Sequence, residues 1–210
     1  MIPLGILGSA RVTAGGALPG TYLGSYTSST AGTSHTFTGV ALGAASSTRT
    51  ILVIAGGRAS NNGVVSGITI GGNAATLDVS SAAAWYPGAI GRLVVPAGTT
   101  ADVVVTFSMS RAEAAVMVYS LPVAVTVAGS GAQIATDPTV TIATAAGGWA
   151  VAGVIRADAT QTFGGVTEDA STALGSYWYE CGSAATTGSN LVITTTGGSS
   201  ALVAAAYTPA

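Results

Sequence analysis

Short apolar runs separated by turn residues constrain what this chain can fold into. The runs are β-branched and Thr-rich, and Gly, Ser, Asn or Pro interrupts them about every 8–12 residues, a spacing typical of a β-sandwich or barrel. We expect strands at His35–Val40, Arg49–Gly56, Gly67–Gly72, Gly91–Gly98, Asp102–Ser108, Ala114–Leu121, Thr139–Thr144, Trp149–Ile155 and Asn190–Thr196.

Helix is a minor expectation. The stretch Ser110–Ala115 ("SRAEAA") could form one helical turn. Ser80–Trp85 ("SSAAAW") is rich in alanine but lies between turn signals, so we interpret it as the start of a strand. The chain is therefore predicted to be all-β, an antiparallel β-sandwich of jelly-roll or immunoglobulin-like type.

Two stretches of the sequence resemble two later ones. Gly71–Tyr86 aligns with Gly164–Tyr179, with Gly-Gly and Trp-Tyr at the same spacing. Val104–Pro122 aligns without gaps on Leu191–Pro209. This similarity predicts that the chain is built from two weakly similar repeats.

The repeat units are expected at about residues 33–122 and 137–209, inside a body that covers residues 21–210. Two small sandwiches and one larger sandwich with a pseudo-twofold axis both fit the pattern. We favour one compact body, because the segment between the repeats is itself strand-like rather than linker-like.

The charge content is low. Charged residues make up 7% of the chain, against about 25% in typical domains, and all six positive residues are Arg. The formal net charge of −2 leaves no basic field for nucleic acid or an anionic membrane, so neither partner is expected. A surface wetted by Ser, Thr, Asn and Gly suits a protein packed into an assembly, or one that faces harsh extracellular conditions.

The opening peptide "MIPLGILGSARV" does not resemble a secretion signal. No basic residue precedes its apolar run, Pro3 and Gly5 interrupt it, and Arg11 follows it. No stretch approaches the roughly 20 apolar residues of a membrane-spanning helix. We therefore expect synthesis in a cytoplasm without export by the usual route.

Residues 1–20 are predicted to be an N-terminal docking segment. Ile2, Leu4 and Ile6 alternate, with Leu7 beside them, so an extended peptide would present them along one side. Such a segment can add as a strand to the sheet edge of a neighbouring protein. The alternative is that the segment is the first strand of its own sandwich.

Few residues could carry catalysis. His35, the one histidine, alternates with Phe37 and is expected to be an exposed strand residue; Cys181 is expected to be a half-buried thiol. Most carboxylates fall in turns, and Glu168 and Asp169 would point to opposite faces of a strand. The chain is predicted not to be an enzyme and to use no metal or cofactor. A polysaccharide depolymerase, which needs two facing carboxylates, is the weaker alternative.

Aromatic residues cluster in two places. Trp85 and Tyr86 recur as Trp178 and Tyr179, and Tyr177 precedes the second pair. These rings could stack on sugars, as in many carbohydrate-binding sandwiches. Recurrence in both repeats favours core or interface packing, because ligand sites tend to diverge between copies.

Three segments carry a family resemblance: "TFTGVALGAASSTRTILVIAGG", "SGITIGGNAATL" and "LVVPAGTTADVVVTFS". Together with the opening "MIPLGILGSA", they make nearly the whole chain similar to tailed-bacteriophage and prophage virion proteins. The resemblance implies a non-enzymatic virion structural protein, a β-sandwich on the capsid or tail surface, as a decoration, head spike, collar, minor tail protein or fibre.

The same resemblance implies a location and partners. The chain would be assembled into the virion in the host cytoplasm and would contact other capsid or tail proteins. A homo-oligomer is expected, with three-fold symmetry by analogy with virion spikes and fibres. The alternative function is a receptor-binding tail or head-fibre module that recognises a host-surface glycan through exposed aromatic rings.

Overall fold

The computed structural model describes residues 18–156 and 161–210. Within these residues every regular element is a β-strand and the sheets are antiparallel, which confirms the predicted all-β sandwich. The strands are β1 (Thr21–Ser28), β2 (Gly32–Ala41), β3 (Thr50–Arg58), β4 (Val65–Ile70), β5 (Asn73–Ala74), β6 (Thr76–Ser80), β7 (Gly88–Val94), β8 (Thr100–Arg111), β9 (Glu113–Leu121), β10 (Val125–Thr136), β11 (Thr139–Ile142), β12 (Ala146–Arg156), β13 (Thr162–Gly164), β14 (Thr167–Leu174), β15 (Tyr177–Thr187), β16 (Leu191–Thr196) and β17 (Ser199–Pro209).

The strands form four sheets, two in each half of the chain. The N-terminal half makes a five-stranded sheet, β1-β9-β3-β7-β6, and a four-stranded sheet, β2-β8-β4-β5. The C-terminal half makes β10-β17-β12-β15-β14 and the three-stranded β11-β16-β13. The two five-stranded sheets correspond strand for strand, with β10 in the place of β1 and β17 in the place of β9. We call β1–β9 the N-terminal unit and β10–β17 the C-terminal unit.

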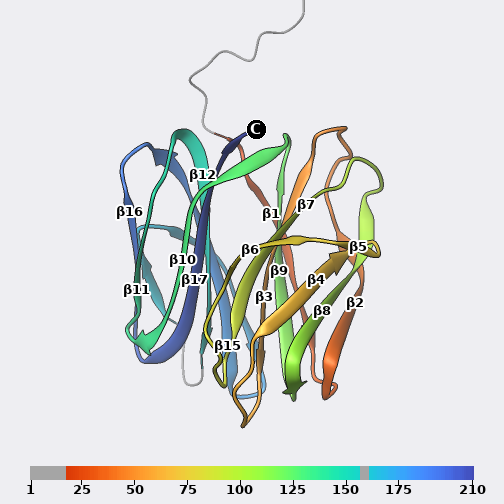
Figure 1. The fold of residues 1–210 in the computed structure, drawn as a ribbon, viewed down its shortest axis with the longest axis vertical. Coiled ribbons are helices and arrows are strands. Elements are labelled where there is room, and N and C mark those ends of the chain that lie inside the picture. The colour runs from red at the N-terminus through yellow and green to blue at the C-terminus, as the bar shows by residue number, and fades with distance from the viewer. Residues whose placement is uncertain (1–17, 157–160) are drawn as a thin grey trace, which may run out of the picture.

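The sheets stack as four layers, with the two five-stranded sheets inside (Figure 1). One hydrophobic cluster fills each unit, between its outer and inner sheet. A third cluster lies between the two inner sheets, and its members include Ile54 of β3 and Val151 of β12. The body is therefore two sandwiches packed back to back.

This layering explains two different sequence patterns. In β3, Ile51 and Val53 face the cluster of the N-terminal unit, while Leu52 and Ile54 face the central cluster, so the strand is a continuous apolar run. In the outer strand β2 the pattern alternates, with buried residues separated by exposed ones. Covering both faces of the inner sheets thus accounts for the most apolar segments.

The inner sheets approach each other closely at two glycines. A Cβ on Gly153 would lie 2.3 Å from Cγ2 of Ile54, and a Cβ on Gly56 would lie 2.0 Å from Cδ1 of Ile155. In each unit, a glycine of the inner sheet thus leaves room for an isoleucine side chain of the other unit. Reciprocal contacts of this kind are typical of a two-fold related interface.

The strand pairing fixes which residues of the two units are equivalent. In β1 a bulge follows Tyr22, the partner of Tyr119, and in β10 a bulge follows Val127, the partner of Tyr207. Tyr119 and Tyr207 are therefore equivalent, whereas the gapless alignment pairs Tyr119 with Ala206. The sequence alignment is therefore off by one residue. A shift of one residue matters because it exchanges the two faces of a strand.

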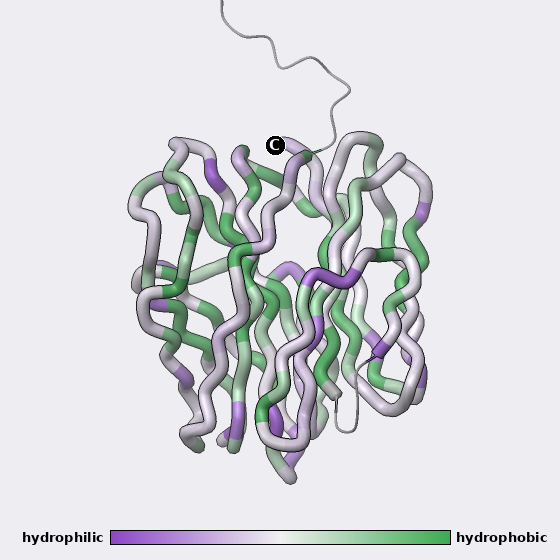
Figure 2. Tube along the Cα trace, turned by 180° about the vertical axis from the view of Figure 1, so that it is seen from behind, coloured by the Kyte–Doolittle hydropathy of each residue, from purple (hydrophilic) through white to green (hydrophobic). Residues whose placement is uncertain are grey.

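The chain joins and leaves the body at one end (Figure 1). Leu18 donates its N–H to the Gly147 carbonyl at 2.9 Å, and Ala210 donates to the Ala124 carbonyl at 3.0 Å. Leu18 is buried in the central cluster, so the body begins at Leu18. Residues 18–20 had been assigned from the sequence to the docking segment. Seen from behind, much of the trace is pale, with few strongly hydrophilic segments (Figure 2).

Candidate functional site

His35 is buried rather than exposed, with 2% of its surface accessible. Its ring nitrogens lie 3.1 Å from Ser28 Oγ and 3.1 Å from the Gly32 carbonyl, and its ring meets the edge of Phe107. Burial lowers the pKa of His35, so the imidazole is neutral near pH 7. The expectation of exposure was wrong because His35 shares the inward face of β2 with Phe37.

Cys181 and Glu180 are also enclosed. Cys181 belongs to the central cluster, and burial raises its pKa to about 12, which leaves an unreactive thiol. Both oxygens of Glu180 accept the Gln161 N–H at 3.0 Å, and Oε1 accepts the Ser171 hydroxyl at 3.0 Å. Both side chains are fully buried, and they stabilise the fold.

Two aspartates are held by bonds between the units. Asp78 accepts a hydrogen bond from the Tyr207 hydroxyl at 2.9 Å, and Asp169 accepts one from the Tyr119 hydroxyl at 2.8 Å. Asp78 is also ion-paired with Arg92 at 2.9 Å. Across residues 18–156 and 161–210, no three His, Cys, Asp or Glu side chains come together as a metal ion would need. Nor do these residues contain a helix long and apolar enough to cross a membrane.

The five aromatic candidates separate into different environments. Tyr179 is fully buried in the central cluster, and Trp178 is half-buried in β15. Tyr86 and Tyr177 pack with ring centroids 5.5 Å apart, and the Arg58 guanidinium lies over the Tyr177 ring at 4.1 Å. Trp85 differs from all of these, because 53% of its surface is exposed.

Trp85 borders a hollow of about 300 Å³ in which both units take part. The N-terminal unit supplies the connection between β6 and β7 and the one before β4, and the C-terminal unit supplies β10 and the start of β17. The lining residues are Asn62, Ala83, Ala84, Trp85, Tyr86, Ile134, Ser199 and Ser200. None of these side chains carries a charge.

Arg111 holds in place residues 81–87, the connection between β6 and β7 that contains Trp85 and is called the Trp85 connection below. Its side chain is fully buried, and Nη1 donates to the carbonyls of Asn61, Ala84 and Trp85 at 3.1, 3.5 and 3.4 Å. Ala59 donates its N–H to the same Trp85 carbonyl at 3.1 Å. A strand was expected to start at residues 80–85; Ser80 instead ends β6, and residues 81–85 form an irregular connection that these bonds keep in place.

The two bonds of a single β-bridge complete this support. Gly63 and Ala84 exchange N–H···O bonds, each 3.1 Å long. The stretch "SRAEAA", considered above for a helical turn, instead covers the end of β8 and the start of β9, with Ala112 alone between the two strands. Arg111, the last residue of β8, therefore joins this connection between the outer and inner sheets to the Trp85 connection.

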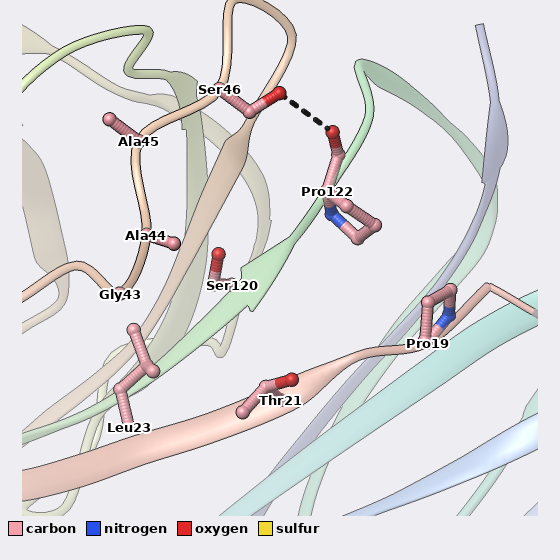
Figure 3. Close-up of a pocket in the computed structure, with 9 residues that line it drawn as sticks. All are labelled: Pro19, Thr21, Leu23, Gly43, Ala44, Ala45, Ser46, Ser120 and Pro122. Atoms are coloured by element: carbon pink, nitrogen blue, oxygen red, sulfur yellow. Dashed lines mark hydrogen bonds between the residues drawn. The ribbon is translucent and has the colours of Figure 1, made fainter.

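A second hollow, of about 350 Å³, lies at the end where the chain joins the body (Figure 3). The hollow lies between β1, the end of the neighbouring strand β9, and the connection that contains Ser46. Thr21 of β1 is paired with Ser120 of β9, and the Ser46 hydroxyl donates to the Pro122 carbonyl at 3.3 Å. The predicted docking residues precede this region and lie outside the described residues; they are Ile2, Leu4, Ile6 and Leu7.

Comparisons with known proteins found no similar protein: no family model, no curated protein and no solved structure matches this chain. The architecture itself defines an all-β protein with two paired sandwiches. Sequence patterns alone had not indicated Asn62, Ile134 or Ser200 as site residues, because they meet only when the two units pack together. Arg111 carried a weak signal, as one of six cations in a charge-poor chain.

Proposed function

We propose that this chain is a non-enzymatic structural protein on the capsid or tail surface of a bacteriophage particle, attached through its N-terminal segment. The observation that carries the proposal is the place where that segment joins the body. Residues 1–17 lead into Leu18 at the end that also holds Ala210 and the second hollow. A body held there presents its opposite end outward.

The chemistry of the body supports an assembly role rather than catalysis. His35 and Cys181 are enclosed, and Asp78, Asp169 and Glu180 are engaged in bonds that hold the fold. An enzyme would need at least one such group facing a cleft with room for substrate. The candidate nucleophile and bases instead stabilise packed sheets.

The outer sheets offer surfaces for neighbours in such an assembly. Met109 of β8 is 45% exposed and Val192 of β16 is 48% exposed, each on an outer layer. Partly apolar sheet faces with little charge are suited to packing against other virion proteins or other copies of the chain. The homo-oligomer, with its three-fold symmetry, and the assembly in the host cytoplasm belong to this proposal.

The test compares particles made with three forms of the chain. These are the full-length chain, a form lacking residues 1–17, and a variant with Ile2→Ser, Leu4→Ser and Ile6→Ser; Thr13→Ser is the matched control. Cutting before Leu18 keeps that buried residue in the central cluster. Particles are purified by density gradient and probed for the chain, and each protein is melted to check its fold.

The proposal expects the full-length chain and the Thr13→Ser control in the particles, and the other two forms folded but free. If the full-length chain is absent from purified particles, the virion assignment is wrong. If the truncated form still co-purifies with the particles, attachment through the N-terminal segment is wrong, while the virion assignment stands.

A further inference from the structure

We propose that the hollow beside Trp85 binds a neutral saccharide, with one sugar ring stacked on the indole. This site lies at the end of the body away from Leu18 and Ala210, since Gly88, just after the Trp85 connection, pairs with Gly56 near the far end of β3. The inference does not depend on the virion assignment.

The apolar part of the hollow matches the carbon face of a sugar. Trp85 is 53% exposed and Ile134 is 43% exposed, and both line the hollow together with Ala83 and Ala84. Small-molecule sites combine such apolar and aromatic walls with a few placed polar groups. A sugar ring has the same division, because its C–H groups form a face that stacks on aromatic rings while its hydroxyls point outward.

The polar part supplies partners for those hydroxyls. Ser200 is 1% exposed, and its Oγ has no hydrogen-bond partner within the described part of the chain. A buried hydroxyl without a partner is unfavourable, and a ligand hydroxyl that reached it would remove that cost. Ser199 and Asn62 line the same hollow and offer a second hydroxyl and an amide.

The absence of charge in the lining favours a neutral sugar over an acidic one. The eight residues that line the hollow include no Asp, Glu, Lys or Arg. The nearby Arg111 guanidinium is fully buried, donates to the backbone carbonyls of Ala84 and Trp85, and is not part of the lining, so it positions the connection rather than the ligand. Fixing the connection in advance lowers the entropy that binding would cost.

The two copies of the aromatic pair have diverged. Trp178 lies within the inner sheet, where it pairs with Arg156 of β12 and Ala173 of β14, and it is half-buried. Trp85 stands in an irregular connection and is exposed. Shared packing would keep the two tryptophans in similar surroundings, so the difference supports a separate role for Trp85.

The test uses nuclear magnetic resonance on the full-length chain, whose three tryptophans give three indole N–H signals. The signals are assigned with Trp→Phe variants. The probes are maltotriose, cellotriose, chitotriose, mannotriose and lactose at millimolar concentration, with sialyllactose as the acidic counterpart. We expect at least one neutral probe to shift the Trp85 signal and leave those of Trp149 and Trp178 in place.

Variants then test the site. Trp85→Ala should weaken binding by about tenfold or more, and Ser200→Ala by a smaller factor, while Val192→Ala, an equally exposed apolar residue on another sheet, should change nothing. Melting curves check that each variant is folded. The proposal is overturned if no neutral probe binds, if Trp85→Ala binds like the parent protein, or if sialyllactose binds more tightly than lactose.

Discussion

Tyr119 and Tyr207 occupy equivalent places in the two units, and each donates its hydroxyl to a carboxylate of the opposite unit. Tyr207 bonds to Asp78 at 2.9 Å, and Tyr119 bonds to Asp169 at 2.8 Å. Each aspartate is the extra residue of a β-bulge in the edge strand of its inner sheet. The bulges therefore place two carboxylates where the opposite unit can reach them.

The two crossed bonds are expected to differ in strength. The Asp78 side chain is 2% exposed, whereas Asp169 is an exposed residue that water can reach. Tyr207→Phe should lower the free energy of unfolding by about 1–3 kcal/mol, and Tyr119→Phe by about 0.5–1 kcal/mol. Equilibrium denaturation of both variants measures the difference. Equal losses, or a larger loss for Tyr119→Phe, would contradict this account.

Asp78 should make stability depend on pH. Burial raises its pKa above the ordinary value of 3.8, and the bonds from Tyr207 and Arg92 only partly oppose this. The folded state therefore keeps the proton to higher pH than the unfolded chain does. The resulting contribution to stability is present below about pH 3.8 and is lost as the pH rises through the raised pKa.

Asp78→Asn removes that titration. Unfolding free energies of the parent protein and the variant are compared from acidic pH upward. The parent should lose stability relative to the variant as the pH rises. A constant difference, or one with the opposite slope, would show that burial does not control this carboxyl group.

The glycine contacts between the inner sheets should tolerate no side chain. Gly153→Ala places a Cβ against Ile54, next to that residue's branch point, and should cost about 1–3 kcal/mol of unfolding free energy. Gly67→Ala is the matched control, since a Cβ there meets nothing within 4 Å, and it should change stability by less than about 0.5 kcal/mol. Adding Ile54→Val to Gly153→Ala should recover none of the loss if Cγ2 alone causes it.

Cys181 should be unreactive until the protein unfolds. With its pKa raised to about 12, the thiol is almost wholly protonated at pH 8, and it is fully buried. A thiol-reactive disulfide reagent should therefore label the folded protein very slowly and the denatured protein at once. Rapid labelling under native conditions would mean that the central cluster opens readily.

The sequence predicted the strands well where burial produces a simple pattern. Arg49–Gly56 was expected as a strand and corresponds to β3, because both faces of that strand are covered by apolar layers. His35 was placed on the wrong side, since alternation reveals that two faces differ but not which of them is buried. Polar His35 and apolar Phe37 both point inward.

The alignment of the repeats failed by one residue for a similar reason. In β17 the run Ala201–Tyr207 is apolar at every position, so sliding it by one still matches apolar with apolar. The tyrosine hydroxyls and the bulges opposite them fix the register, and neither has a sequence signature. The hollow beside Trp85 could not be predicted from the sequence either, because Ser200 and Trp85 come together only through packing between strands that are distant in the chain.

The back-to-back arrangement also determines how many sites one chain can present. In a dimer of identical subunits every surface appears twice, so a useful hollow and any damage to it are both duplicated. Joining the two halves in one chain lets Trp85 and Trp178 take different surroundings while Tyr119 and Tyr207 keep the same crossed bonds. Each chain then offers a single Trp85 hollow, and the valency of a larger assembly equals its number of chains.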